Sequence, residues 1–330
     1  METTFQCLLV SESANGYASA IVTKTINDLP EGDILIRVRY SSLNYKDALS
    51  ASGNRGVTRT YPHTPGIDAA GVIESTNHPD WKVGDEVLVT GFDLGMNTSG
   101  GFAQYIRVPA RWVVRLPKGL SLRESMIYGT AGFTAGLSVA ALLKNGVTAD
   151  TGSIGVTGAT GGVGSIAIAI LHRLGYTVTA VSGKAASHHF LTSIGASDII
   201  NRAELDDTSG KILLKTRFAG AIDTVGGNVL ATLLKCVHYG GTVTACGMVN
   251  GGELNTTVFP FILRGIQLAG IDSVEFPSEK RAAIWQNLAT DWKPDTLDTL
   301  VHEIGLSDLP DAIQTILNGR MQGRALVRIE

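Results

Sequence analysis

The clearest stretch with residue types suited to chemistry is the glycine-dense run at 156–164, VTGATGGVG. Gly158, Gly161 and Gly164 recur there every third residue, between a strand-like and a helix-like stretch. Glycines in such a turn let a pyrophosphate approach backbone amides at the positive end of a helix. The run predicts a dinucleotide site, and a tight turn without a ligand is the alternative. We expect its contacts to come from Thr160, Gly161, Gly162 and Val163.

The end of the next strand-like stretch indicates which dinucleotide is bound. An enzyme for NAD places Asp or Glu there for the ribose 2′-hydroxyl, but this chain has Ser182, Gly183 and Lys184. Ser182 can donate a hydrogen bond to a 2′-phosphate, and Lys184 adds a positive charge. Arg202 follows the third strand-like stretch and can add a planar guanidinium. The pattern predicts NADPH, whereas the alternative makes Lys184 and Arg202 ordinary surface cations.

Strand and helix patterns alternate from about residue 153 onward, which positions this turn. Strand patterns at 153–158, 177–183, 198–201, 219–227 and 242–248 are interleaved with helix patterns at 163–175, 186–196 and 228–241. Such alternation predicts a parallel, doubly wound sheet, a Rossmann fold of the α/β class. A further strand pattern at 266–272 follows, and it can be an edge strand that continues the sheet into a second subunit or a covered edge.

The first part of the chain follows another pattern. Short alternating runs separated by turns predict a β-rich domain over residues 1–122, and a helical pattern begins at about 122. A helix pattern and a closing strand pattern at 295–330 are expected to complete that domain. The region 123–294 is then the dinucleotide-binding domain.

Composition excludes several classes of protein. The 330 residues are 44% hydrophobic and 17% charged, with a net charge of −3, so the chain can bury large cores but has no basic stripe. Nucleic acid and membrane surfaces are therefore not expected partners. The three cysteines lack disulfide or zinc-ribbon spacing, and we find no signal peptide and no apolar run of membrane-spanning length. We expect a cytoplasmic protein.

A set of motifs resembles the medium-chain dehydrogenase/reductase superfamily. More narrowly, the chain is similar to the zinc-free quinone oxidoreductase-like branch of YhdH/YhfP type, which includes NADPH-dependent acrylyl-CoA reductases. The resemblance implies a GroES-like catalytic domain joined to a Rossmann domain, an active site between them, and a homodimer. It rests on SSLNYKDAL (41–49), PGIDAAGVI (65–73), GGFAQYIRV (100–108), GTAGFTA (129–135), VTGATGGVG (156–164), VTAVSGK (178–184), AIDTVGG (221–227) and QGRALV (322–327).

The same resemblance bears on a metal site. Relatives with zinc carry Gly-His-Glu where this chain has Gly66, Ile67 and Asp68, and a cysteine near Asn44. Zinc needs three protein ligands of His, Cys or carboxylate type, and His63 alone does not supply them. We predict no metal.

By resemblance, the catalytic residues lie in the Asn-Tyr-Lys-Asp run at 44–47. Tyr45 can donate a proton or a hydrogen bond, Asn44 can hold an enolate oxygen or the cofactor ribose, and Asp47 can orient either. Each also has a structural interpretation: Tyr45 as a packed aromatic, Asp47 as a helix cap and Asn44 as a turn residue. Lys46 is expected to be a surface cation.

Further cofactor contacts are expected elsewhere in the chain. Thr130 faces the nicotinamide by resemblance, although a helix cap is an equal alternative. The loop after the fifth strand of the sheet should meet the nicotinamide half of the cofactor. We expect Cys246 in that region to be a buried structural thiol. The additional expected contacts are Ala48, Gly247, Met248 and Ile262.

Without a metal, an NADPH enzyme can still reduce an activated carbon–carbon double bond. The resemblance therefore implies reduction of an α,β-unsaturated acyl-CoA, with acrylyl-CoA as the best single substrate. A quinone or enone oxidoreductase is the alternative, and a non-catalytic NADPH-binding sensor is a third. Phosphates of coenzyme A require cations, for which Arg55, Arg59, Arg107, Arg264 and Arg324 are available, and the alternative for Arg324 is that it ties the tail of the chain back to the cleft.

Overall fold

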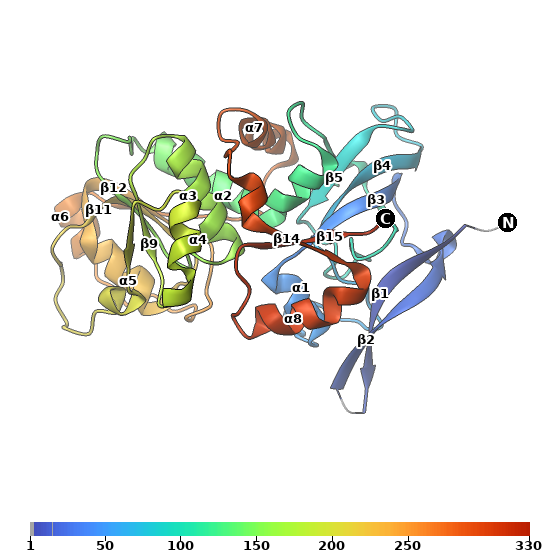
Figure 1. The fold of residues 1–330 in the computed structure, drawn as a ribbon, viewed down its shortest axis with the longest axis horizontal. Coiled ribbons are helices and arrows are strands. Elements are labelled where there is room, and N and C mark those ends of the chain that lie inside the picture. Colours follow the sequence, from blue (N-terminus) through green and yellow to red (C-terminus); the bar gives the residue numbers. More distant parts are fainter. Residues whose placement is uncertain (1–2, 15) are drawn as a thin grey trace. The chain divides into compact units, whose positions relative to one another are not determined.

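The computed structural model describes residues 3–14 and 16–330, and these form two compact units, many of whose elements are labelled in Figure 1. The first unit combines the chain up to Thr130 with Val274–Ala289 and Val301–Glu330. The second comprises Ala131–Ser273 and Thr290–Leu300. The structure thus assigns 123–130 and 274–289 to the first unit, although they were predicted to lie in the second, and it assigns 295–300 to the second unit, although that segment was predicted to lie in the first.

The first unit is built on a seven-stranded sheet in the order β14-β15-β3-β4-β5-β7, with β6 paired to β3. The closing strand β15 pairs antiparallel with β3, so the tail returns to the first unit. Most residues of β3, β4, β5 and β15 are buried, and their apolar side chains share one core with α1 and α8. The elements are β1 (Thr4–Ser13), β2 (Gly16–Thr25), β3 (Ile34–Leu43), α1 (Tyr45–Ala51), β4 (Asp68–Thr76), β5 (Glu86–Thr90), β6 (Tyr105–Val108), β7 (Val114–Arg115), α7 (Ser278–Ala289), β14 (Val301–Gly305), α8 (Leu309–Leu317) and β15 (Arg324–Arg328).

A buried arginine attaches the segment 274–289 to this unit. Arg281, which is 1% exposed, donates hydrogen bonds to the carbonyl oxygens of Thr90, Val274 and Phe276. Its guanidinium also lies 4.2 Å from the ring centroid of Phe92. Because carbonyls and an aromatic face replace water around the charge, the segment is held to the end of β5.

The second unit contains the predicted parallel sheet. Its six strands run in the order β10-β9-β8-β11-β12-β13, the arrangement of a doubly wound Rossmann sheet. All five neighbouring pairs are parallel. The elements are β8 (Ile154–Val156), α3 (Gly162–Arg173), β9 (Val178–Val181), α4 (His188–Ser193), β10 (Asp198–Ile200), β11 (Phe218–Asp223), α5 (Gly227–Cys236), β12 (Val237–Ala245), α6 (Phe259–Arg264) and β13 (Gln267–Gly270).

The helix α2 (Leu122–Lys144) is interrupted at Gly129, where φ is 51° and ψ is −155°. By length and hydropathy α2 could cross a membrane, which the sequence analysis did not anticipate, but 78% of its apolar window is buried in the protein. The interruption also leaves each part shorter than a membrane span requires. The helix is a core helix.

Gly129 cannot be replaced without displacing buried groups. A Cβ at this position would lie 2.3 Å from Oδ2 of Asp68 and 2.4 Å from Oγ of Ser42, and its φ lies in the left-handed region. We expect Gly129→Ala to lower the free energy of unfolding by at least about 3 kcal/mol in urea titrations.

Gly146→Ala is the matched control, because Gly146 also has a positive φ, of 80°, but nothing within 4 Å of its Cβ position. We expect that variant to lose only about 1 kcal/mol. Equal losses in the two variants would show that crowding at Gly129 does not matter.

Candidate active site

A fully buried carboxylate, Asp68, is the centre of a hydrogen-bonded cluster in the first unit. Asp68 is the first residue of β4, and its Oδ2 accepts from Ser42 Oγ at 2.6 Å and from Asn44 Nδ2 at 2.7 Å. Thr130 donates to Oδ1 from its hydroxyl at 2.6 Å and also donates its backbone N–H. Such donors are required because no water solvates a buried carboxylate. Asn44 and Thr130 are therefore held in place by hydrogen bonds to the same carboxylate, that of Asp68.

Arg324 supplies the positive charge of this cluster. Its side chain is 3% exposed, and Nη2 lies 3.8 Å from Asp68 Oδ2. The guanidinium donates to the carbonyl oxygens of Ile127 and Leu43 and to Asn44 Oδ1. Burial lowers the pKa of Arg324, while the nearby Asp68 and Asp47 carboxylates oppose that shift. Arg324 is therefore bound within the protein and is not free to hold a coenzyme A phosphate.

A second buried carboxylate, Asp47, organises the start of α1. Its Oδ1 accepts backbone N–H groups from Gly66 at 3.1 Å and Ile67 at 2.8 Å, and its Oδ2 accepts the N–H of Asn44 at 2.8 Å. Burial and the neighbouring Asp68 carboxylate raise the pKa of Asp47 to about 7, although these N–H donors favour its charged form. Asp47 thus joins α1 to the loop before β4.

The predicted catalytic residues differ in their access to a ligand. Asn44 is 8% exposed and Asp47 is fully buried, with both side chains engaged in the cluster, whereas Tyr45 is 43% exposed. Asn44 and Asp47 also have the capping roles that the sequence analysis kept as alternatives. Ala48 is fully buried in the hydrophobic core of the first unit, so it presents no side chain to a cofactor here.

The side chains at the zinc position of the family do not fit a metal. Asn44 is hydrogen-bonded to Asp68 and Arg324, and Ile67 offers no side-chain donor atom. The imidazole of His63 is hydrogen-bonded to the carbonyl oxygen of Gly95 at 2.9 Å, and burial lowers its pKa. Within residues 3–14 and 16–330, no three His, Cys, Asp or Glu side chains are placed to bind one ion.

The glycine-dense turn of the second unit lies between β8 and α3, as predicted. Gly161 is the N-cap of α3, and the first N–H groups of a helix have no acceptor within it. A Cβ on Gly164 would lie 2.5 Å from the carbonyl oxygen of Gly158, and one on Gly158 would lie 2.1 Å from Thr224 Oγ1. Only glycine permits this close turn, which leaves backbone amides facing any phosphate placed there.

Asp223 at the end of β11 holds the start of the glycine-dense turn through a hydrogen bond with Thr157. Its carboxylate is fully buried and accepts from Thr157 Oγ1 at 2.7 Å and from the Gly226 N–H at 2.7 Å. Thr157 in turn accepts the N–H of Thr224, and burial raises the pKa of Asp223. The carboxyl ends of β8 and β11 are therefore joined by one polar network.

The predicted 2′-phosphate residues also lie close together. Ser182 is nearly buried at the end of β9, and its hydroxyl accepts the backbone N–H of Lys184 at 3.1 Å. A Cβ on Gly183 would lie 3.2 Å from Nε of Arg202, so the guanidinium passes directly over this glycine. Lys184 and Arg202 are both exposed. The structure thus brings three potential donors to the edge of the sheet.

The loop after β12 meets the same edge. A Cβ on Gly247 would lie 1.9 Å from the carbonyl oxygen of Thr224, which places this loop against the end of β11. Met248 and Ile262 are strongly exposed, at 75% and 71%. Cys246 is partly exposed, not buried as expected; partial burial and the Asp223 carboxylate raise the pKa of its thiol to about 12, which opposes the reactive thiolate form.

Sequence reasoning missed two residues that organise these sites. Asp68 was considered only as part of an absent zinc motif and Asp223 not at all, whereas Arg324 was considered both as a phosphate ligand and as a residue that ties the tail of the chain back. A signal was present: charged residues within otherwise apolar strand patterns, which burial permits only when they are paired.

Two family descriptions match the chain in this order. Residues 30–118 match the alcohol dehydrogenase GroES-like domain, and residues 162–290 match the zinc-binding dehydrogenase domain. The first match falls on the seven-stranded sheet and the second on the six-stranded sheet. The fold is therefore a GroES-like domain together with a Rossmann domain, as predicted.

Similar proteins extend over nearly the whole chain. YhfP of Bacillus subtilis is 46% identical over 330 residues, 100% of both chains, and its solved structure with NAD bound has a TM-score of 0.97 over 99% of this chain and 100% of that one. The acrylyl-CoA reductase AcuI of Ruegeria pomeroyi is 43% identical over 98% of this chain and 99% of its own.

The YhdH oxidoreductase from Salmonella enterica, solved in complex with NADP, is 45% identical, covers 98% of this chain and 100% of its own, and has a TM-score of 0.96. These likenesses agree with the motifs and with both sheets. The chain belongs to the quinone oxidoreductase-like family of medium-chain dehydrogenases/reductases, together with YhfP, YhdH and AcuI.

Proposed function

We propose that this protein is a cytoplasmic, NADPH-dependent reductase of the carbon–carbon double bond of an α,β-unsaturated acyl-CoA, with acrylyl-CoA as substrate. The observation that carries the proposal is the 43% identity to an acrylyl-CoA reductase over 98% of the chain. The poor fit of zinc to the Asn44 site is consistent with it, because alkene reduction needs no metal to polarise an alcohol.

The residues of the second unit fit NADPH. The close approach of Gly158 and Gly164 provides a backbone cradle for the pyrophosphate. Ser182, Lys184 and Arg202 supply donors for the 2′-phosphate, and no acid stands among them to repel it. YhdH is solved with NADP and YhfP with NAD, so relatives alone do not decide the choice. When bound, NADPH supplies the hydride for the β-carbon.

Tyr45 is the exposed residue of the Asn-Tyr-Lys-Asp run and is proposed to contact the substrate directly. The phenol of Tyr45 can donate a hydrogen bond to the thioester carbonyl while negative charge develops on that oxygen. Asn44 and Asp47 act as positioning residues, since their side chains hold the turn that begins α1. The hydroxyl of Thr130 donates a hydrogen bond to Asp68. The Thr130 oxygen would therefore act as an acceptor toward the carboxamide N–H of a bound nicotinamide.

The alternatives differ in measurable ways. A quinone or enone reductase would use the same cofactor but an apolar substrate slot. A sensor would bind NADPH without turnover, although an exposed Tyr45 beside an ordered buried cluster favours an enzyme. Of the five arginines considered for coenzyme A, four already donate hydrogen bonds within the protein. They are Arg107, Arg264 and Arg324, which donate to carbonyl oxygens, and Arg55, which donates to a carbonyl oxygen and to Glu12.

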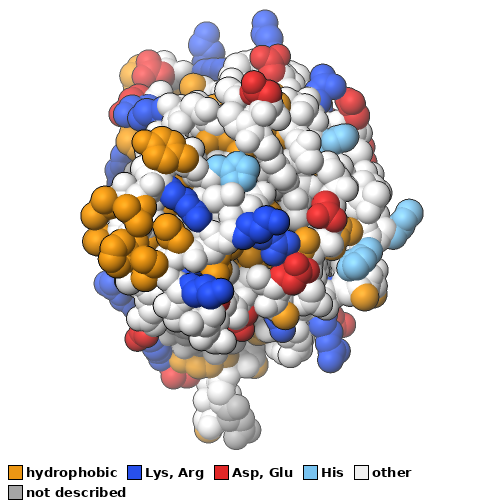
Figure 2. Space-filling view, turned by 90° about the vertical axis from the view of Figure 1, so that its left-hand side faces the viewer, with side chains coloured by type: hydrophobic (Ala, Val, Ile, Leu, Met, Phe, Trp, Pro, Cys, Tyr) orange, Lys and Arg blue, Asp and Glu red, His pale blue; other side chains and the backbone are white. Residues whose placement is uncertain are grey.

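We also propose a homodimer formed through the edge of the six-stranded sheet. The strand β13 ends the sheet, and its outer edge has no strand partner among the described residues. Beside it, Tyr239 is 82% exposed near Gly265, and α6 exposes further apolar side chains. Figure 2 shows hydrophobic side chains gathered on this end. Two-fold pairing of β13 with its copy would cover both the edge and the patch.

Turnover with different acceptors tests the proposed function. We expect NADPH oxidation with acrylyl-CoA, slower oxidation with crotonyl-CoA, little with 1,4-benzoquinone, and no effect of EDTA. Tyr45→Phe should lower kcat with acrylyl-CoA by about 10- to 100-fold, because the phenolic donor is lost. The neighbouring Lys46→Ala is the control and should keep its rate. Turnover of quinone alone would overturn the proposal.

The cofactor assignment has its own test. Ser182→Ala combined with Lys184→Ala should raise the KM for NADPH at least about tenfold and leave the KM for NADH nearly unchanged, because only NADPH carries the 2′-phosphate. Lys144→Ala, an exposed cation of the same unit, should change neither. Equal increases for both cofactors would show that the phosphate is not held at these residues.

The homodimer is tested by the mass of the protein in solution. We expect light scattering to give the mass of two chains for the wild type and of one chain for Ile262→Asp, because a buried unpaired charge opposes association. Val83→Asp, at a 68% exposed apolar position of the first unit, should remain a dimer. A monomeric wild type would contradict the proposal.

A further inference from the structure

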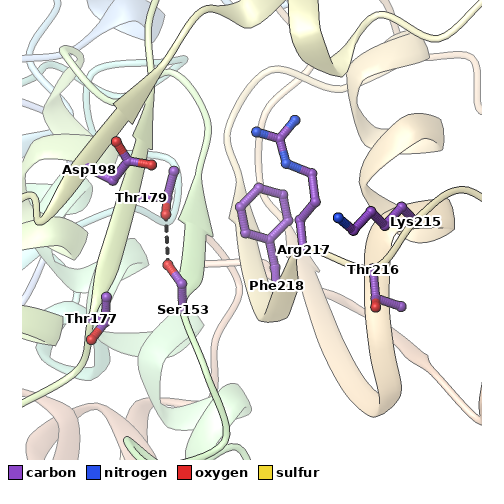
Figure 3. Close-up of a pocket in the computed structure, with 8 residues that line it drawn as sticks. All are labelled: Ser153, Thr177, Thr179, Asp198, Lys215, Thr216, Arg217 and Phe218. Carbon is purple, nitrogen blue, oxygen red and sulfur yellow. Dashed lines mark hydrogen bonds between the residues drawn. The ribbon is translucent and has the colours of Figure 1, made fainter.

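The second unit has a hollow of about 610 Å³ at the amino ends of its central strands, which we call the amino-end hollow. Figure 3 shows its two walls. The glycine-dense turn follows the carboxyl end of β8, so the hollow and the proposed cofactor site lie at opposite ends of the strands. The lining residues are Ser153, Thr177, Thr179, Asp198, Lys215, Thr216, Arg217 and Phe218.

One face of the sheet is polar at this end. Thr179 pairs in register with Gly155 and with Asp198, so the three residues share a face. Farther along the strands this face carries Val181 and Ile200, which join the core with α5. Parallel sheets normally bury apolar residues on both faces. The change to hydroxyls and a carboxylate therefore marks a polar end of this face, where Thr179 is buried and Asp198 is exposed.

The connection from β10 to β11 leaves that part uncovered. A short helical turn, Arg202–Leu205, covers the carboxyl half through the buried Leu205, but residues 206–217 form no helix. The ring of Phe218 fills the space over Gly155, within about 3.3 Å of where a Cβ would lie. The buried ring of Phe218 thus forms the bottom of the amino-end hollow, and no helix among the described residues covers the space above it.

The two walls carry opposite chemistry. On one wall, Ser153 and Thr179 share a hydrogen bond of 2.7 Å, drawn as the dashed line in Figure 3, and Asp198 lies nearby. The other wall carries Lys215 and Arg217. Arg217 is paired with Glu204 at 3.1 Å and lies over the Phe218 ring, whereas the ammonium of Lys215 makes no ion pair within the described residues. An uncommitted cation therefore faces hydroxyls and a carboxylate across the hollow.

We propose that the amino-end hollow binds a small phosphorylated sugar. Its phosphate would be held by Lys215 and the second edge of the Arg217 guanidinium. Its hydroxyls would donate to Asp198 and exchange hydrogen bonds with Thr177 and Thr179. A simple anion fits less well, because Asp198 would repel it and the hydroxyl wall would remain unused. The volume is within the range of small-molecule sites.

Calorimetric titration of the full-length protein tests this site. Ribose 5-phosphate should bind at least about tenfold more tightly than ribose or inorganic phosphate, since only it engages both walls. Lys215→Ala and Asp198→Asn should each weaken binding of ribose 5-phosphate at least about fivefold. Lys211→Ala removes an exposed lysine of the same connection outside the lining and should have no effect.

The titration is repeated with saturating NADPH to separate the two sites. An unchanged Kd supports a second site, whereas competition would place the sugar phosphate in the cofactor site and overturn the proposal. Absence of binding up to about 10 mM, or equal binding by all variants, would also overturn it. Because these measurements require no turnover, their failure is independent of the proposed reductase activity.

Discussion

Burial of the Asp68 carboxylate is the constraint on which the first unit depends. A charged group without water must be surrounded by donors, and here they come from β3, the turn before α1, the Thr130 backbone and β15. These segments are distant in sequence, so the need to solvate one carboxylate brings them together. The kink at Gly129 follows from the same crowding, because no side chain fits beside Asp68 and Ser42.

This arrangement also shows why the residues present do not fit zinc at the position expected from the family resemblance. The position of a cysteine ligand is taken by Asn44, whose amide bridges Asp68 and Arg324. The backbone of Ile67, at the position of a histidine ligand, is bound by Asp47. Hydrogen bonds and one ion pair therefore occupy the polar groups at this position. The site that remains is suited to orienting a substrate and donating a hydrogen bond.

The sequence predicted much of the fold because its signals are local. Strand and helix periodicity and the spacing of glycines indicated the parallel sheet and the turn before α3. The helical pattern gave the wrong end for one helix, because pairing with a distant strand determines that end. A helix was expected over 228–241, but α5 ends at Cys236, and Val237 pairs with Phe218 of β11. Asp68 and Arg324 were not recognised as partners because their contact joins residues 256 positions apart, from 68 to 324, which no local pattern reveals. The resemblance to the family pointed to Asn44 and Asp47, but only the structure shows that both side chains are buried.

The transfer of isotope from cofactor to product shows whether this protein moves a hydride from NADPH to a conjugated thioester. Acrylyl-CoA is reduced with NADPH that carries deuterium at both C4 positions of the nicotinamide, and the position of deuterium in propionyl-CoA is determined by NMR and mass spectrometry. Hydride transfer to a conjugated thioester predicts cofactor-derived deuterium at C3 only, with the new C2 hydrogen taken from solvent. Product without cofactor-derived deuterium, or no propionyl-CoA despite NADPH binding, would contradict the proposed reductase activity.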